Sequence, residues 1–448
     1  MRHSNQLALT APWIGHEHAT ELATISDLLD AQPRLAALVQ QDLLAACRTN
    51  PRTGRAGLTG DQVLRMLVAR QLNGWTYAEL AFHLADSGSY QTFCRVSGFG
   101  PAPSKSALAA NLRRVRPETL ATLNDLLVTG NAARAVETGR AVRIDSTVVP
   151  VAIHPPTDSA LLLDGVRVLL RLLRHAEHFA GFTAYHRHLK RAKRRALAIQ
   201  HLAPQATGRR RAAYRDLLTL AQATADYASC ALAHVARLPP TRARRRLQHA
   251  LAQFLPLVQQ AIAQATRRVL HGEAVPAPEK IVSLFEAHAD VLVKDRRETY
   301  YGHKIFLTGG ASGLILDCAI PKGNPADSTW ALPMLRRQGT LFGRSPRQAS
   351  FDGGFASGDN LAAAHALPVR DVCFAKTRGL AVLDMVKSGW VYRKLRNFRA
   401  GIESAISFLK RVFGLARCIW KGAPAFHAYV RAAVLAANLV VLARHRLA

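Results

Sequence analysis

The sequence predicts a mixed α/β fold: a mixed sheet with helices on its faces, an N-terminal helical domain, and a large basic helical insertion after the first core strand. Three observations lead to this prediction. The chain has 448 residues and is 49% hydrophobic, enough for two or three domains with buried cores. Strand-like and helix-like segments alternate in its second half. A long block without strand signals separates the first strand from the later ones.

The charge of the chain narrows the class of partner. Sixty Lys and Arg residues against thirty Asp and Glu give a net charge of +30 and an isoelectric point near 11.0. A chain this basic is typical of proteins that bind a polyanion, and nucleic acid is the first candidate. Its six scattered cysteines form no CxxC pair, which excludes a zinc ribbon and indicates a reducing cytosol. The N-terminus lacks a signal-peptide core, and the apolar run 432–443 is too short for a membrane span.

The N-terminal third reads as helical. Residues 1–55 form an extension with two short apolar stretches, which ends at the turn-rich, basic segment 50–55. In residues 56–135, Thr59 and Thr76 are expected to cap two helices. Short helices with tight polar turns are typical of a helix-turn-helix-like DNA-binding domain, although a helical dimerisation module fits them as well.

A third helix is expected within residues 101–115, with its cap at Ser104 or Ser106. Lys105, Arg113 and Arg114 lie on it and would contact phosphates if this domain binds DNA.

The α/β core is predicted to begin in residues 136–157 with a strand at 141–151, which is rich in β-branched residues. Residues 158–280 then read as long helices. Between residues 171 and 250 there are 17 Lys and Arg against 3 Asp and Glu. A run of charge is often only a solvated helix face, but its concentration here favours an insertion that faces DNA.

The core resumes over residues 281–422 and is followed by a C-terminal helix at 423–448. A β-hairpin is expected first, because two strand-like segments flank a Gly-Ala-Ser-Gly turn. The elements expected within this part are the hairpin strands 298–309 and 314–323, a helix capped by Asp327 or Ser328, a buried strand at 347–355, a helix from Asp359, a strand at 371–376, and an amphipathic helix at 396–415.

Three acidic residues stand out by their placement: Asp145 within the first strand, Asp352 at the end of a later strand, and Glu403 on the amphipathic helix. A carboxylate in an apolar strand is costly to bury unless it meets a cation or a partner. Together the three would supply hard oxygen ligands for Mg²⁺ or Mn²⁺, and two such ions can activate both sides of a phosphodiester. Taken singly, each Asp fits a cap or turn, and the Glu fits a solvated helix face.

Several stretches together resemble a known family. They are RIDSTVV, KDRRETYYGHK, KGNPADST, SFDGGFAS and VYRKLRNFRAGIESAISFLKR. With them the chain resembles bacterial insertion-sequence transposases of the DDE class, most closely the group labelled ISNCY, over roughly residues 58–422.

The resemblance implies a ribonuclease-H-like core in which Asp145, Asp352 and Glu403 form the acidic triad and hold Mg²⁺ or Mn²⁺, with two ions expected. It also implies double-stranded DNA partners, namely the terminal inverted repeats of a transposon and its target, and a homodimer on DNA. A bacterial transposase acts in the cytoplasm at the nucleoid, and no membrane partner is expected.

Many members carry a signature of Tyr, Arg, Glu and Lys around the third acid. Arg399, Glu403 and Lys410 fit its spacing, whereas Arg396 stands at the Tyr position. The resemblance therefore implies DNA contacts for Arg399 and Lys410. His303 and Lys304 could contact the scissile phosphate or flanking DNA, or the histidine could be structural. Trp330 and Trp420 fit either stacking on an unpaired base or core packing.

Two other functions remain open from sequence alone. A metal-dependent, structure-specific nuclease or resolvase on the same type of core would cut DNA without joining it to a target. A transposase-derived DNA-binding protein would bind without catalysis, although the intact set of three acids disfavours this.

Overall fold

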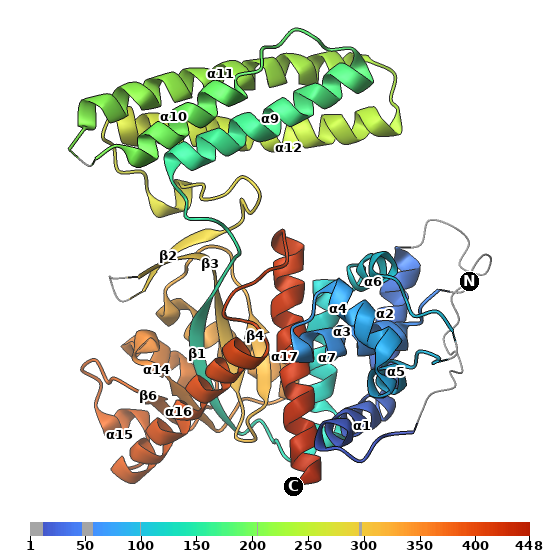
Figure 1. The fold of residues 1–448 in the computed structure, drawn as a ribbon. Coiled ribbons are helices and arrows are strands. Elements are labelled where there is room, and N and C mark those ends of the chain that lie inside the picture. The colour runs from blue at the N-terminus through green and yellow to red at the C-terminus, as the bar shows by residue number, and fades with distance from the viewer. Residues whose placement is uncertain (1–11, 47–56, 99, 204, 295–297) are drawn as a thin grey trace. The chain divides into compact units, whose positions relative to one another are not determined.

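The computed structural model describes residues 12–46, 57–98, 100–203, 205–294 and 298–448 (Figure 1). The chain divides into two compact units. The first unit comprises residues 1–150 and 303–448, and the second comprises residues 151–302. The boundary expected at residues 50–55 lies outside the described residues.

The first unit begins with short helices. They are α1 (Glu17–Asp30), α2 (Pro33–Ala45), α3 (Gly60–Asn73), α4 (Tyr77–Asp86), α5 (Gly88–Cys94), α6 (Lys105–Leu112), α7 (Pro117–Thr129) and α8 (Asn131–Arg134). Thr59 and Thr76 form capping boxes at the starts of α3 and α4, as their sequences predict. Ser104 caps α6 through the backbone N–H of Ala107. The sequence does not predict helix α5.

Helix α3 is the centre of this helical part, since it is buried on nearly every side. The guanidinium of Arg65 on α3 is enclosed and paired with Asp30 at 2.8 Å and Asp61 at 2.9 Å. Asp30 belongs to α1, and the backbone N–H of Gly60 also donates to Gln40 on α2. The described part of the N-terminal extension therefore packs onto the next helices instead of standing apart as a separate segment.

The sheet of the first unit is mixed. Its strands are β1 (Ala141–Pro150), β3 (Glu298–Gly309), β4 (Ile315–Ala319), β5 (Gln348–Phe351) and β6 (Asp371–Phe374). Their order is β3-β1-β5-β6, with β4 paired to the other edge of β3. The pairs β1–β5 and β5–β6 are parallel, and β3–β4 is the antiparallel hairpin that the sequence predicts.

Helices flank this sheet. They are η3 (Asp327–Trp330), α13 (Ala331–Phe342), η4 (Gly353–Phe355), α14 (Gly358–Ala366), α15 (Val382–Met385), α16 (Gly389–Val412) and α17 (Ala423–Leu447). Three expected starts are wrong. Asp327 and Ser328 lie inside η3 and neither caps a helix, since α13 begins at Ala331 without a side-chain cap. The side chain of Ser357 caps α14 by accepting from Asn360, so Asp359 lies inside its first turn. Ser388 caps α16, which therefore begins seven residues before Arg396.

Helix α17 packs against α1, α3, α7 and β4, and Figure 1 shows it between the sheet and the N-terminal helices. Among the described residues it is the one helix long and apolar enough to cross a membrane, and 78% of its most apolar window is buried inside the protein. Asn438 on this helix is buried and hydrogen-bonds Asn124 of α7 and the backbone of Ile315 in β4. The apolar character of α17 is thus accounted for by packing.

The second unit contains the helical insertion. Its helices are α9 (Asp158–Ala180), α10 (Leu189–His201), α11 (Thr207–Arg237), α12 (Arg242–Ala265), the π-helical turn η1 (Thr266–Leu270) and the short η2 (Ala277–Glu279). The four long helices share one apolar core, and Gly165 on α9 leaves room for the close approach of Val258 on α12. A strand that the sequence did not reveal, β2 (Asp290–Lys294), pairs antiparallel with residues 298–302 of β3.

Candidate active site

Two of the three candidate acids lie side by side at one edge of the sheet. Strands β1 and β5 are parallel, with Ile144 opposite Phe351 in the register. The residues that follow them are Asp145, within β1, and Asp352, directly after β5. Because parallel neighbours carry successive residues at the same level, this register alone brings the two carboxylates together.

Helix α16 brings the third acid to this edge. Its buried residues Leu395, Ile402 and Leu409 pack toward the sheet, and α16 contacts β1, β5 and β6. The hydroxyl of Ser350 in β5 donates to the carbonyl of Leu395 at 3.0 Å, which fixes the helix against that strand. Glu403 then lies on the flank of the helix beside its buried stripe, on the same side as Arg399, and its side chain is 60% exposed.

Arg399 joins the three carboxylates. Its Nη1 lies 3.6 Å from Oδ2 of Asp145 and 3.7 Å from Oδ1 of Asp352. Its Nη2 donates to Oε1 of Glu403 at 2.7 Å. The acids, which are 207 and 51 residues apart in sequence, therefore converge on one guanidinium. Both aspartate oxygens lie within 3.7 Å of the same nitrogen atom, so the two carboxylates are close neighbours.

The environment of Asp145 differs from that of its two neighbours. Its side chain is 15% exposed, against 46% for Asp352. Burial raises the pKa of Asp145 to about 6, and the negative charges of Asp352 and Asp327 act in the same direction. The backbone N–H of Ser146 and the guanidinium of Arg399 lower the pKa, with a smaller combined effect. Excess negative charge of this kind is a property of a site that binds a cation.

A fourth carboxylate adjoins the site, and sequence reasoning misses its role. Asp327 caps nothing. Instead, its Oδ1 accepts from the hydroxyl of Ser146 at 3.0 Å and from Nζ of Lys304 at 3.2 Å. A Cβ on Gly354 would lie 2.7 Å from the Asp327 carboxylate, so the absence of a side chain at Gly354 allows this approach. An acid followed by Ser and Thr resembles a helix start so closely that its sequence holds no signal for this contact.

The other predicted residues lie in different places. Lys304 reaches the site through Asp327, and it also donates to the carbonyl of Pro325 at 2.9 Å. His303 is buried, with its ring packed edge-on against Phe426 at 4.6 Å, so the structure favours the structural alternative for it. Lys410 lies on the same helix as Glu403. Lys105 is exposed at the start of α6, and Arg113 and Arg114 follow its end.

The donor set fits a hard divalent cation, because the acids that surround Arg399 offer only carboxylate oxygens. Among the described residues, no group of three His, Cys, Asp or Glu side chains is close enough to form a ready-made metal cage. Arg399 instead places a positive group among the carboxylates. The residues that would hold an ion are Asp145, Asp352 and Glu403, once the guanidinium has moved from between them.

Residues 293–439, about a third of the chain, match the family model described as the transposase DDE domain. No curated protein and no solved structure matches the chain at a significant level. The match supports a DDE-class insertion-sequence transposase, and the mixed sheet with its flanking helices is consistent with the ribonuclease-H-like core of such a domain. It includes Asp352 and Glu403, whereas Asp145 precedes it. Membership of the ISNCY group stays a prediction.

Proposed function

We propose that the protein is a DNA transposase of an insertion sequence, which cleaves the transposon ends and joins them to target DNA through Asp145, Asp352 and Glu403. The observation that carries this proposal is the convergence of the three carboxylates on Arg399, from a strand, a strand end and a helix that are far apart in sequence. The match of residues 293–439 to the transposase DDE domain supports it independently.

The proposed reaction has two steps. In the first, water attacks a phosphodiester at the transposon end, the bond between phosphorus and the 3′ oxygen breaks, and a free 3′-hydroxyl leaves. In the second, this hydroxyl attacks a phosphodiester of the target and displaces a 3′ oxygen there. Neither step needs a covalent protein intermediate.

Each acid has a proposed role in holding divalent ions, either Mg²⁺ or Mn²⁺. Asp145 and Asp352 hold the ions, and Glu403 holds the second ion or orients the water. Bound there, the ions would activate the attacking oxygen and neutralise charge on the leaving oxygen. Arg399 would then turn from the carboxylates to the phosphate, since a guanidinium pairs well with either group.

DNA recognition belongs to the basic parts of the chain. The N-terminal helices and the insertion would bind the terminal inverted repeats, with the homodimer holding two ends in the bacterial cytoplasm at the nucleoid. On helix α10, Lys190, Lys193 and Arg194 are exposed and form no ion pair with the described residues, whereas Arg191 and Arg195 are exposed but pair with Asp216 of α11. The three cations without an ion pair are the part of this helix proposed to contact phosphates.

The test uses purified protein, Mg²⁺ and duplex DNA containing the flanks of its own element. Wild type should nick the transposon end, and Asp352→Asn should lower the rate at least about a hundredfold, because one ion ligand is lost. Asp359→Asn, an exposed acid seven residues further on, is the matched control and should cleave normally. Equal cleavage by wild type and Asp352→Asn would contradict the proposal.

A second assay separates the alternatives. A pre-cleaved end with a free 3′-hydroxyl is supplied together with target plasmid, and strand-transfer products are measured. A transposase joins the end to the target, whereas a nuclease or resolvase yields only cleavage. A non-catalytic DNA-binding protein gives neither product in any metal.

A further inference from the structure

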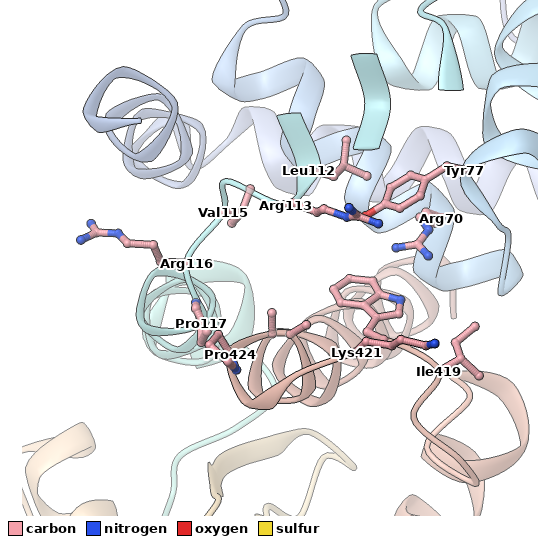
Figure 2. Close-up of a pocket in the computed structure, with 13 residues that line it drawn as sticks. Arg70, Tyr77, Leu112, Arg113, Val115, Arg116, Pro117, Ile419, Lys421 and Pro424 are labelled. Carbon is pink, nitrogen blue, oxygen red and sulfur yellow. The ribbon is translucent and has the colours of Figure 1, made fainter. Parts of the chain in front are cut away.

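A cavity of about 820 Å³ lies in the first unit, away from the three acids (Figure 2). Its walls come from α3 and α4, the turn between α6 and α7, and the segment that leads into α17. Residues from both ends of the chain thus enclose one space. Its volume is within the range of small-ligand sites, roughly 300–1,000 Å³.

Arg70 is the unusual residue of this cavity. It is only 6% exposed, and its guanidinium lies between two aromatic rings, 4.1 Å from the centre of Tyr77 and 4.6 Å from that of Trp420. Its Nε donates to the carbonyl of Trp75, while Nη1 is enclosed and has no hydrogen-bond partner among the described residues. A charged group buried without a counter-ion is costly, so the site is incomplete without an anion.

Other cations that line the cavity also favour an anionic ligand. Arg113 lies 5.6 Å from the Tyr77 ring, on the same side of the cavity as Arg70 (Figure 2), and Lys421 is exposed on the opposite wall. Burial lowers the pKa of Arg70, and the charge of Arg113 adds to this. In the described part of the chain, no carboxylate lines the cavity. The fourth cation, Arg116, is neutralised by Asp42, to which its Nε donates at 2.5 Å.

The rest of the wall is apolar, which distinguishes the expected ligand from a free phosphate ion. Pro117, Ile419 and Pro424 line the cavity beside the cations, and Ile419 is 54% exposed. A ligand that matches both features has a phosphate next to a flat apolar group. A nucleotide has this composition, and aromatic residues with arginine form the usual platform for an unpaired base.

We propose that this cavity binds one unpaired nucleotide of DNA, with its phosphate near Arg70, Arg113 and Lys421 and its base against Trp420 and the apolar wall. The choice of DNA as the source of the nucleotide rests on the proposed function. The cavity is a separate site from the acids around Arg399, so a strand end or a single-stranded stretch could be held while another segment lies at the acids.

The test measures binding to the full-length protein in EDTA, which keeps the acidic site from contributing through metal. Three probes are compared: inorganic phosphate, dAMP, and a fluorescent single-stranded 10-mer containing one 5-bromodeoxyuridine. The 10-mer should bind more tightly than dAMP, and phosphate should bind most weakly. After irradiation, the cross-linked peptide identified by mass spectrometry should contain Tyr77 or Trp420. A cross-link confined to other peptides would overturn the proposal, and so would binding of phosphate as tight as that of dAMP.

Two variants sharpen the result. Lys421→Glu changes an exposed side chain, so it should fold normally and weaken the 10-mer about tenfold. Trp420→Ala should weaken the 10-mer and dAMP but not phosphate. Arg34→Ala alters an exposed cation on α2 that does not line the cavity and is the control. If Lys421→Glu and Trp420→Ala both bind the 10-mer as tightly as wild type does, the proposal is overturned, even if dAMP binds elsewhere on the protein.

The outcomes separate this inference from the proposed function. Normal nicking of transposon ends together with unchanged 10-mer binding in both variants removes only the nucleotide site. Absence of nicking, with a cross-link at Trp420 and weakened binding in Lys421→Glu, removes only the transposase reaction.

Discussion

At the scale of single residues, Asp145 is a carboxylate whose surroundings disfavour its ionised form. The carboxylate is buried in a strand, and Asp352 follows the neighbouring strand. Asp327 accepts a hydrogen bond from the hydroxyl of Ser146, the residue next to Asp145. Each of these features makes the ionised form of Asp145 less favourable than it is in water. A bound divalent cation would reduce that penalty, because its charge favours the ionised form of Asp145 and offsets the repulsion from the neighbouring carboxylates.

This penalty leads to a prediction about stability. Burial raises the pKa of Asp145 to about 6 from an ordinary value near 3.8. Above pH 6 the folded protein holds an unfavourable carboxylate, and below pH 4 the group is protonated in both the folded and the unfolded state. Replacing Asp145 with Asn should therefore raise the free energy of unfolding at pH 8 in EDTA by about 1–2 kcal/mol, with a matching rise in melting temperature. At pH 4 the substitution should have little effect.

Melting curves of wild type and Asp145→Asn, measured at both pH values by circular dichroism, check this. The same substitution at the exposed Asp359 controls for the loss of one carboxylate. A gain in melting temperature that is equal at pH 4 and pH 8 would show that burial of charge is not its cause.

The same group should govern the pH dependence of the proposed metal binding. Since a protonated Asp145 offers no charge to a cation, Mn²⁺ affinity should fall as pH decreases through about 6. Titration with Mn²⁺, followed by electron paramagnetic resonance at pH 5 and pH 8, measures this. Affinity that is the same at both values would exclude Asp145 as a ligand.

Sequence reasoning singles out Asp145, Asp352 and Glu403 by their placement in strands and on an amphipathic helix, and the resemblance to DDE transposases joins them into a triad. It misses Asp327 and Arg70 for a physical reason. An acid before Ser and Thr resembles a cap, and an arginine within an amphipathic helix resembles a solvated side chain. Their positions become clear only from tertiary contacts. Asp327 contacts Ser146, and Arg70 contacts Tyr77 and Trp420.

At the scale of elements, the position of α16 on the sheet decides where Glu403 lies. Arg143 of β1 extends beneath this helix, stacks on Phe398 and donates to its carbonyl at 3.2 Å. Gly401 provides the space, because a Cβ there would overlap the Arg143 guanidinium. The contact between a strand arginine and a helix glycine thus sets how closely Glu403 approaches Asp145.

A methyl group at this contact should separate the helix from the sheet. We expect Gly401→Ala to destabilise the protein by about 1–3 kcal/mol and to lower DNA cleavage at least tenfold, since overpacking shifts the helix that bears Glu403. Thermal melting and the nicking assay measure the two effects.

The control lies in the same helix. Among the described residues, and apart from its chain neighbours and the helix's own backbone, nothing lies within 4 Å of the position that a Cβ on Gly389 would occupy. Gly389→Ala should therefore leave cleavage unchanged and stabilise the helix slightly. Equal cleavage by Gly401→Ala and Gly389→Ala would show that the Arg143 contact does not position Glu403.

Local signals are enough to predict most elements. Capping residues indicate the starts of α3, α4 and α6. The β-branched residues indicate β1, and the Gly-Ala-Ser-Gly turn between two strand-like segments indicates the β3–β4 hairpin. The strand β2 escapes prediction because five residues next to a charged segment hold little periodicity. The predicted start of α16 is too late, since the Ser-Gly pair at 388–389 resembles a turn until Ser388 is seen to cap the helix.

At the scale of the whole molecule, the second unit carries much of the positive charge without contributing any of the three acids. Its helices bury an apolar core, which leaves Lys and Arg on their outer faces. The helical nature and the extent of this insertion are predictable, because long amphipathic helices have strong periodicity. Its packing around Gly165 and Val258 is not, since such contacts depend on the register between helices.

If this surface binds DNA, affinity must depend on salt. The double variant Lys193→Ala/Arg194→Ala should weaken binding to duplex DNA and reduce the slope of log affinity against log salt by about 0.9 for each phosphate that the protein no longer neutralises. Fluorescence anisotropy between 50 and 200 mM salt measures the slope.

The control removes two exposed cations of the first unit, Arg34→Ala/Lys387→Ala, with the same change in net charge. If both double variants show the same slope of log affinity against log salt, the helices of the second unit affect DNA binding only through the net charge of the protein.

The chain enters and leaves the second unit through neighbouring backbone groups, for the N–H of Val151 donates to the carbonyl of Tyr301 at 2.9 Å. The roughly 150 residues between them occupy the place of a short loop. In evolutionary terms, whole helices can be gained or lost here by insertion or deletion in the gene, while the separation of Asp145 and Asp352 in space stays the same. Chains with very different distances between the two aspartates in sequence can therefore place them at the same separation in space.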